Sequence, residues 1–221
     1  MTIALPLLVD DDPSSTCFVA GSAGGRLLLV TSLHQLGTAK KFAAAIPPHG
    51  GDISVRQVYP LQRVPYVELD FLLCDHVLDL AVLVTKDPLI PPPRPRFLGS
   101  GLSPAIGEDM FVIGYPFAPI GSFPETMTST TISSLGIRAV SGVPYVKEFT
   151  VNVLAHIGLS GSPVIRKSDG VVCGVLRGCI SPPAMMMTGS IPLGNDSTIA
   201  VCVVSDYIPS LISQATVLIN A

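Results

Sequence analysis

Glycine and proline interrupt this chain so often that long helices are excluded over most of its length. The 221 residues include 20 glycines and 21 prolines. Relative to alanine, a helix interior is weakened by roughly 1 kcal/mol for each glycine and about 3 kcal/mol for each proline. The segments between them are short apolar runs bounded by turn residues, which is typical of buried strands. The pattern predicts an all-β barrel or sandwich.

The apolar runs place the strands, and one segment at the end of the chain has a different period. Strands are predicted at residues 17–20, 26–31, 54–59, 80–84, 110–113, 149–154, 171–176 and 199–204. After residue 204 the apolar residues recur at helical spacing: Ile208, Leu211, Ile212, Ala215, Leu218 and Ile219. Ser205 and Asp206 are the expected helix caps, and Pro209 falls in the first turn, where proline is tolerated.

A proline-rich stretch divides the chain. Residues 87–95 read DPLIPPPRP, and proline donates no hydrogen bond to a strand ladder, so this stretch cannot be a central strand. We interpret it as a semi-rigid linker. It predicts an N-terminal unit over residues 1–95 and a C-terminal unit over residues 96–221.

Charge and composition argue against two classes of partner. The net charge is -3 and no basic run is longer than Lys40-Lys41, whereas nucleic acid binding needs a basic footprint. No apolar run is long enough to span a bilayer, so no membrane partner is expected. Only 13% of residues are charged, against roughly 25% in typical domains. This scarcity fits either a surface covered by a partner or a large all-β core.

Cysteine usage and the N-terminus favour a reducing compartment. The five cysteines form no CxxC pair, and an odd number is unusual for a disulfide-stapled secreted domain. Cys17, Cys173 and Cys202 lie in apolar runs and are expected to be buried thiols. The first residues lack the basic segment and the apolar length of a signal peptide. We therefore predict a cytoplasmic protein.

The strongest chemical signal is a glycine-rich turn around a serine. Residues 158–164 read GLSGSPV. A serine nucleophile for acyl transfer must project from a tight turn whose backbone N–H groups point at the developing oxyanion. Glycine permits the positive φ that such a turn needs. A turn of this kind can equally be a simple strand connection, so other motifs have to decide.

Four further motifs accompany this turn in a consistent order. Residues 26–34 read RLLLVTSLH, an apolar strand that leads to a histidine, and residues 79–83 read DLAVL, an acid that opens another strand. Residues 107–116 read GEDMFVIGYP, and residues 170–175 read GVVCGV. Together, over roughly residues 15–212, the chain resembles trypsin-like serine peptidases, especially bacterial members of the Deg/HtrA type. The resemblance implies two six-stranded antiparallel barrels of the chymotrypsin type, with a C-terminal helix.

The resemblance also implies an activity and the residues that perform it. The expected function is that of a serine endopeptidase that hydrolyses protein or peptide substrates through an acyl-enzyme. His34 would be the general base and acid, Asp79 would orient the imidazole, and Ser160 would be the nucleophile. The backbone N–H groups of Gly158 and Ser160 would form the oxyanion hole. No cofactor or metal is implied, and a regulatory domain or protein partner is left open.

The same resemblance predicts a substrate pocket. Leu154, six residues before the nucleophile, would form its floor. His156 would line the site or be a polar loop residue. The strand after the nucleophile would supply the wall, with substrate contacts from Val175, Leu176, Arg177 and Gly178. A leucine floor offers no carboxylate for a basic side chain, so cleavage after apolar residues is expected. Asp196 lies in a loop that could bring an acid into this pocket.

The sequence departs from the family pattern at three positions. Leu33 stands where a small residue is common, Ser162 replaces a glycine, and Leu159 replaces the aspartate by which digestive zymogens are activated. Activation through that ion pair is therefore not expected.

Alternatives remain at several positions. Asp75 is a second candidate for the triad acid. His76 lies beside a cysteine and an aspartate, but the spacings lack a full zinc ligand set. The alternative function is a catalytically silent, peptidase-like binding module; an intact His/Asp/Ser set argues against it.

Overall fold

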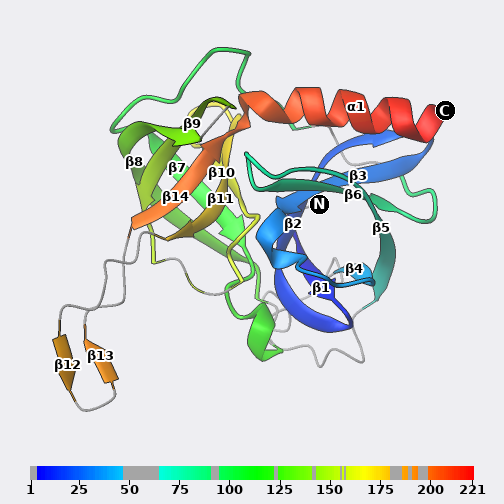
Figure 1. Cartoon of the computed structure of the whole chain (residues 1–221), viewed down its shortest axis with the longest axis horizontal. Helices are drawn as coiled ribbons and strands as arrows, with labels where there is room; N and C mark the ends of the chain where they lie inside the picture. Colours follow the sequence, from blue (N-terminus) through cyan, green and yellow to red (C-terminus); the bar gives the residue numbers. More distant parts are fainter. Residues whose placement is uncertain are drawn as a thin grey trace.

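Two closed antiparallel β-barrels and a C-terminal helix form most of the part of the chain that the structure describes (Figure 1). The computed structural model describes residues 4–46, 65–90, 95–121, 124–140, 143–154, 156, 158–179, 186–188, 191–193 and 199–221. The strand orders are β1-β2-β3-β6-β5-β4 and β10-β11-β14-β9-β8-β7. The predicted all-β class with two six-stranded barrels is confirmed.

The first barrel uses strands from the N-terminal part of the chain. They are β1 (Ala4–Val9), β2 (Asp12–Ala23), β3 (Arg26–Ser32), β4 (Phe42–Ala45), β5 (Tyr66–Asp75) and β6 (Leu80–Thr85). Side chains alternate between the two faces of a strand, and in β3 and β6 both faces are buried. Leu29 and Leu83 fill the barrel, whereas Leu28 and Val82 belong to a second core. This double burial explains why both strands are continuous apolar runs.

That second core lies between the barrels and joins them. Phe18 and Val30 of the first barrel share it with Tyr115, Val175 and Val203, which come from the C-terminal half of the chain. All five side chains are almost inaccessible to solvent. The two barrels are therefore held against each other by a continuous apolar contact.

The second barrel follows the same plan. Its strands are β7 (Asp109–Gly114), β8 (Thr126–Val140), β9 (Val143–Asn152), β10 (Pro163–Arg166), β11 (Val172–Cys179) and β14 (Ile199–Val204). A separate hairpin pairs β12 (Met186–Thr188) with β13 (Ile191–Leu193). Cys173 and Cys202 are buried in this barrel, as Cys17 is in the first, and burial raises the pKa of all three thiols. Their predicted place in the core is confirmed.

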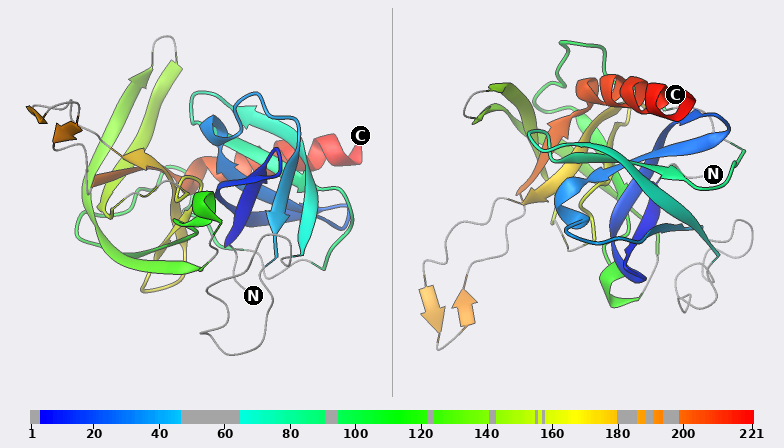
Figure 2. Two further views of the ribbon diagram at one scale, coloured as in Figure 1. Left: turned by 90° about the horizontal axis from the view of Figure 1, so that it is seen from below. Right: turned by 45° about the vertical axis from the view of Figure 1, so that its right-hand side comes forward.

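The chain ends in helix α1 (Ile208–Asn220), which a 3-10 turn at Ser205–Tyr207 precedes. The helix leaves the second barrel and returns to cover the first (Figures 1 and 2). The predicted helix is confirmed, but its predicted caps are wrong. Tyr207 occupies the N-cap position without a side-chain cap, because the Ser205 hydroxyl donates to the Val172 carbonyl and Asp206 accepts from Gly101. Within the described residues, no helix has the length and apolar character of a membrane span.

Most predicted strands coincide with observed ones. The runs at 17–20, 26–31, 80–84, 110–113 and 199–204 fall inside β2, β3, β6, β7 and β14. The runs at 149–154 and 171–176 overlap β9 and β11. The predicted strand at 54–59 lies outside the described residues.

Candidate functional site

A cleft of about 500 Å³ is lined by residues from both barrels. Its lining residues are His34, His76, Asp79, Arg138, Glu148, Arg177, Gly178, Cys179 and Val201. Six of these nine residues are histidine, aspartate, glutamate or arginine. The cleft between the two barrels is therefore lined mainly by polar side chains.

Strand pairing brings His34 and Asp79 together. His34 lies in a 3-10 helix, Leu33–Gln35, directly after β3, and Asp79 directly precedes β6. Because Ser32 of β3 pairs with Leu80 of β6, the residues just beyond this pair are neighbours. The Asp79 Oδ2 lies 2.7 Å from Nδ1 of His34, and its Oδ1 accepts the His34 backbone N–H at 2.9 Å. Two contacts thus orient the imidazole relative to the carboxylate.

The turn that carries Asp79 is held by the other candidate acid. Asp75 Oδ1 accepts the backbone N–H groups of Val77 and Leu78 at 2.8 and 2.9 Å. Asp75 is therefore placed as a turn residue, whereas Asp79 makes the contact with His34. Burial of the Asp79 carboxyl opposes its ionisation, but hydrogen bonds from His34 and the charges of His34 and Arg177 outweigh burial. The pKa of Asp79 consequently lies below its ordinary value.

The serine turn is held from the opposite barrel by Thr16 of β2. The Thr16 backbone N–H donates to the Ser160 carbonyl at 3.1 Å, and its hydroxyl donates to the Gly158 carbonyl at 2.8 Å. The same hydroxyl accepts the backbone N–H of Tyr115 at 3.0 Å. Gly158 and Gly161 have φ values of +106° and +86°, as the sequence pattern required. The peptide groups on both sides of the turn are thereby anchored to the first barrel.

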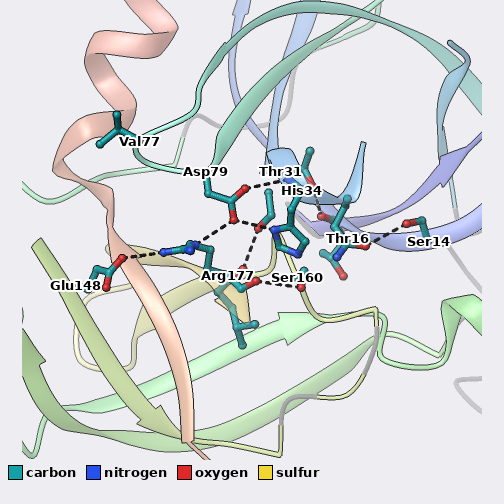
Figure 3. Close-up of polar contacts among 12 residues, drawn as sticks. Ser14, Thr16, Thr31, His34, Val77, Asp79, Glu148, Ser160 and Arg177 are labelled. Atoms are coloured by element: carbon teal, nitrogen blue, oxygen red, sulfur yellow. Dashed lines mark hydrogen bonds and ion pairs between the residues drawn. The ribbon is translucent and has the colours of Figure 1, made fainter. Parts of the chain in front are cut away.

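The Ser160 hydroxyl points toward β11 (Figure 3). Its Oγ donates to the Arg177 carbonyl at 3.2 Å. Among the hydrogen bonds of the described residues, none joins the Ser160 hydroxyl to the His34 ring.

The Arg177 side chain enters the same site. Its Nε donates to Asp79 Oδ2 at 3.0 Å and one terminal nitrogen donates to Glu148 Oε1 at 2.9 Å. Arg138 donates to the same Glu148 oxygen at 2.7 Å and to the Val77 carbonyl. Two arginines and two carboxylates thus alternate along one side of the cleft, and Figure 3 shows Arg177 between Glu148 and Asp79.

The predicted pocket residues fall into three environments. Leu154 is 44% exposed, so its side chain is accessible, whereas Val175 and Leu176 are 0% and 1% exposed. These values cover whole residues, so neither the side chains nor the backbone of Val175 and Leu176 are accessible in this structure, and the Leu176 N–H and carbonyl are paired with Ser162 and Gly161. His156 is exposed, and its ring lies 6.0 Å from that of Phe117. Asp196 lies outside the described residues.

His76, which the sequence left open as a metal ligand, lies near one other potential ligand. Its Nε2 lies 3.6 Å from the Cys74 thiol. In the described part of the chain, no three His, Cys, Asp or Glu residues gather as a metal site would require.

Sequence reasoning missed three residues of this site: Thr16, Arg138 and Glu148. All three act through contacts with residues at least ten positions away in the chain. Thr16 lies in the polar start of β2, and the other two lie on a hairpin without a marked apolar period. No local signal distinguishes them from ordinary surface residues.

Comparisons with known proteins place this site in context. A family model described as a trypsin-like peptidase domain matches residues 15–175. Among solved structures, the inactive form of the Rv3671c protease of M. tuberculosis is similar, with 17% identity over 96% of this chain and 88% of that chain and a TM-score of 0.61. The MamO protease domain of Magnetospirillum magneticum has 14% identity over 96% of this chain and 95% of its own, with a TM-score of 0.62.

A third similar structure contains a bound peptide. The HtrA-type protease AlgW with a tripeptide has 19% identity to this chain and a TM-score of 0.68. The match covers 97% of this chain but only 60% of AlgW. At these identities the structural likeness concerns the fold. No curated protein matches the sequence significantly.

Proposed function

This chain belongs to the trypsin-like peptidase family, and we propose that it is a serine endopeptidase with His34, Asp79 and Ser160 as its catalytic triad. The observation that carries the proposal is the 2.7 Å contact between His34 Nδ1 and Asp79 Oδ2, in a cleft lined by Arg177, whose carbonyl accepts the hydroxyl of Ser160 in the glycine-rich turn. A carboxylate at Nδ1 fixes the tautomer in which Nε2 is free to accept a proton.

Acylation then proceeds from these groups. Ser160 leaves the Arg177 carbonyl, His34 Nε2 takes the hydroxyl proton, and Ser160 Oγ attacks the scissile carbonyl carbon. The backbone N–H groups of Gly158 and Ser160 receive the resulting oxyanion. The tetrahedral intermediate collapses when the leaving amine takes the proton from His34. Water then attacks the acyl-enzyme through the same base, which frees the acid product and restores the serine.

An extended peptide is the substrate form that the cleft suits. The pairing between β10 and β11 ends at Pro163↔Val175, whereas β11 continues to Cys179 at the cleft. The Arg177 carbonyl, which accepts the Ser160 hydroxyl, can therefore accept an N–H of a peptide that lies along this edge. The substrate's N–H would then replace the Ser160 hydroxyl at the Arg177 carbonyl. The tripeptide in the AlgW structure supports a peptide ligand, and a preference for cleavage after apolar residues stays a prediction.

The test is reaction with a fluorophosphonate probe, which phosphonylates an activated serine with loss of fluoride. Wild-type protein is expected to react once per chain. Ser160→Ala is expected to lose labelling and to lower peptide turnover by a factor on the order of 10⁶. Ser162→Ala is the matched control, because Ser162 is buried and its hydroxyl makes no hydrogen bond in the described structure.

Two results would contradict the proposal. Folded wild-type protein that resists the probe and cleaves no peptide would favour a silent, peptide-binding relative. Labelling that persists in Ser160→Ala and disappears in Ser162→Ala would move the nucleophile to Ser162.

A further inference from the structure

A β-bulge directs Arg177 into the catalytic cleft. In the pairing of β11 with β14, Leu176 pairs with Cys202 and Gly178 pairs with Val201, so Arg177 is the extra residue between them. A bulge of this kind re-aims a side chain that a regular strand would point elsewhere. Leu176 on one side is buried, while Gly178 on the other lines the cleft with Arg177. Strand β11 therefore contributes to the core up to Leu176 and to the cleft from Arg177 onward.

Arg177 contacts two members of the proposed triad through different groups. Its side-chain Nε donates to Asp79 Oδ2 at 3.0 Å, and its main-chain carbonyl accepts from Ser160 Oγ at 3.2 Å. Asp79 Oδ2 is also the oxygen that lies 2.7 Å from His34 Nδ1. One carboxylate oxygen is therefore shared between the imidazole and a guanidinium.

The guanidinium is held in place from behind by Glu148. The Glu148 side chain is 14% exposed and the Asp79 side chain 15%, with the 30% exposed Arg177 between them. Glu148 is in turn paired with Arg138 at 2.7 Å. Charge-assisted hydrogen bonds are stronger in such partly buried places than at the surface, because the local dielectric constant is lower. The row Arg138, Glu148, Arg177 and Asp79 therefore connects strands β8, β9 and β11 of the second barrel to the triad acid of the first.

We propose that Arg177, held by Glu148, is a positioning residue that keeps the Asp79 carboxylate oriented toward His34. The proposal rests on the proposed function. Asp79 comes from the first barrel and Ser160 from the second, so a cation on β11 that binds Asp79 also sets the carboxylate relative to the nucleophile turn. The simpler alternative is an ion pair that only stabilises the contact between the barrels.

Two effects of Arg177 on the rate oppose each other. The positive charge of Arg177 partly neutralises the Asp79 carboxylate. The carboxylate then stabilises less strongly the imidazolium that forms during acylation. The hydrogen bond from Arg177 restricts rotation of the carboxylate, whose other tether at Oδ1 is a single backbone N–H. Loss of correct carboxylate placement is costly in triads, at about 10⁴ in turnover when the tautomer is lost. We therefore expect orientation to dominate, with a partial loss because the Oδ1 tether remains.

The test uses the full chain and two readouts. The first is the second-order rate of fluorophosphonate reaction at Ser160, which needs the triad but no extended peptide. Arg177→Leu is expected to lower this rate about tenfold, and Arg177→Lys, which keeps a cation, to recover it to within about threefold of wild type. Arg166→Leu is the matched control and is expected to react at the wild-type rate. Arg166 is also partly buried and pairs with two carboxylates, Glu108 and Asp169.

The second readout is the proton resonance of His34 Nδ1–H, assigned by its absence from His34→Ala. In Arg177→Leu this resonance is expected to broaden and move upfield, because a carboxylate that rotates more freely holds the Nδ1–H less firmly. If the ion pair is merely structural, the carboxylate keeps its orientation, and the resonance stays in place or moves downfield because Oδ2 then accepts one hydrogen bond in place of two. If Arg177→Leu does not fold, Arg177→Gln decides by the same readouts, since it carries no charge and cannot bridge two carboxylates.

The outcomes separate this inference from the proposed function. A reactive wild type whose Arg177 variants keep both the rate and the resonance would overturn the role of Arg177 alone. A slower rate with a resonance that is unmoved or moves downfield would also overturn it, in favour of the structural ion pair. A folded wild type that resists the probe would overturn the proposed function, and the positioning role with it.

Discussion

At the scale of single residues, Asp79 combines an unusual backbone with a fully engaged side chain. Its φ is +58°, in the left-handed region that few residues other than glycine adopt. Its carboxylate accepts from the backbone and ring of His34 and from Arg177. Strained conformations persist where surrounding contacts over-determine them and are concentrated at functional sites. Here these hydrogen bonds hold Asp79 in its left-handed conformation.

The lowered pKa of Asp79 makes a prediction about stability and pH. A carboxyl whose pKa is depressed by folding contributes stability above its unfolded pKa of about 3.9 and loses it as pH falls through the folded value. The difference in unfolding free energy between wild type and Asp79→Asn should therefore narrow as pH falls from about 4.5 to 3. Urea unfolding of both proteins measures it. A difference that stays constant or widens over this range would contradict the contacts described for Asp79.

At the scale of elements, the serine turn depends on a close approach between barrels. A Cβ on Gly161 would lie 2.0 Å from the Thr16 carbonyl and 2.5 Å from the Thr31 hydroxyl. Thr31 itself donates to that carbonyl at 2.8 Å. Gly161 is therefore required for two reasons, its positive φ and the absence of a side chain. The turn and β2 can approach only because no methyl group stands between them.

This close approach predicts the effect of one added methyl group. Gly161→Ala should destabilise the protein by several kcal/mol and greatly lower its reactivity, because Thr16 must move. Gly170→Ala is the control: its φ is +71° but nothing lies within 4 Å of the added Cβ. It should cost only the backbone strain, roughly 1–2 kcal/mol. Urea unfolding and probe reactivity measure both variants. Equal losses in the two variants would mean that the contact with Thr16 is unimportant.

At the scale of the whole molecule, helix α1 closes the apolar core shared by the barrels. Ile208, Leu211 and Ala215 are buried in that core. Ile212 lies so close to β2 that its methyl carbon would be 3.1 Å from a Cβ on Gly21. Helix α1, which follows the last strand of the second barrel in sequence, therefore stabilises the first barrel. Because residues of both barrels and of the helix share this core, loss of the helix contacts should weaken both barrels.

Two identical substitutions on this helix test its contribution. Leu211→Ala removes a side chain that is 5% exposed, and we expect it to cost about 2–5 kcal/mol. Leu218→Ala removes one that is 54% exposed and should change stability by less than about 0.5 kcal/mol. Urea unfolding followed by circular dichroism measures both. If the two variants are equally stable, the helix does not help to hold the barrels together.

Some features follow from the sequence because their physical cause is local. The apolar runs of β3, β6 and β14 are readable because burial on both faces leaves few polar positions. By contrast, β5 and β8 escape detection. Most residues of β5 are exposed or half-buried, and β8 is rich in threonine and serine. Pairing with neighbouring strands, which is a long-range effect, makes them strands.

The candidate site divides in the same way. The residue types at positions 34, 79 and 160 and the glycines around the serine determined which chemistry to expect, because tight turns and strand ends leave a local pattern. Their assembly, and the roles of Thr16 and Glu148, depended on tertiary structure. The bulge at Arg177 arises from its pairing with β14, and its guanidinium meets a carboxylate 98 residues away. Sequence periodicity reports which face a residue occupies within one strand, whereas only the register between strands decides which side chains meet across a cleft.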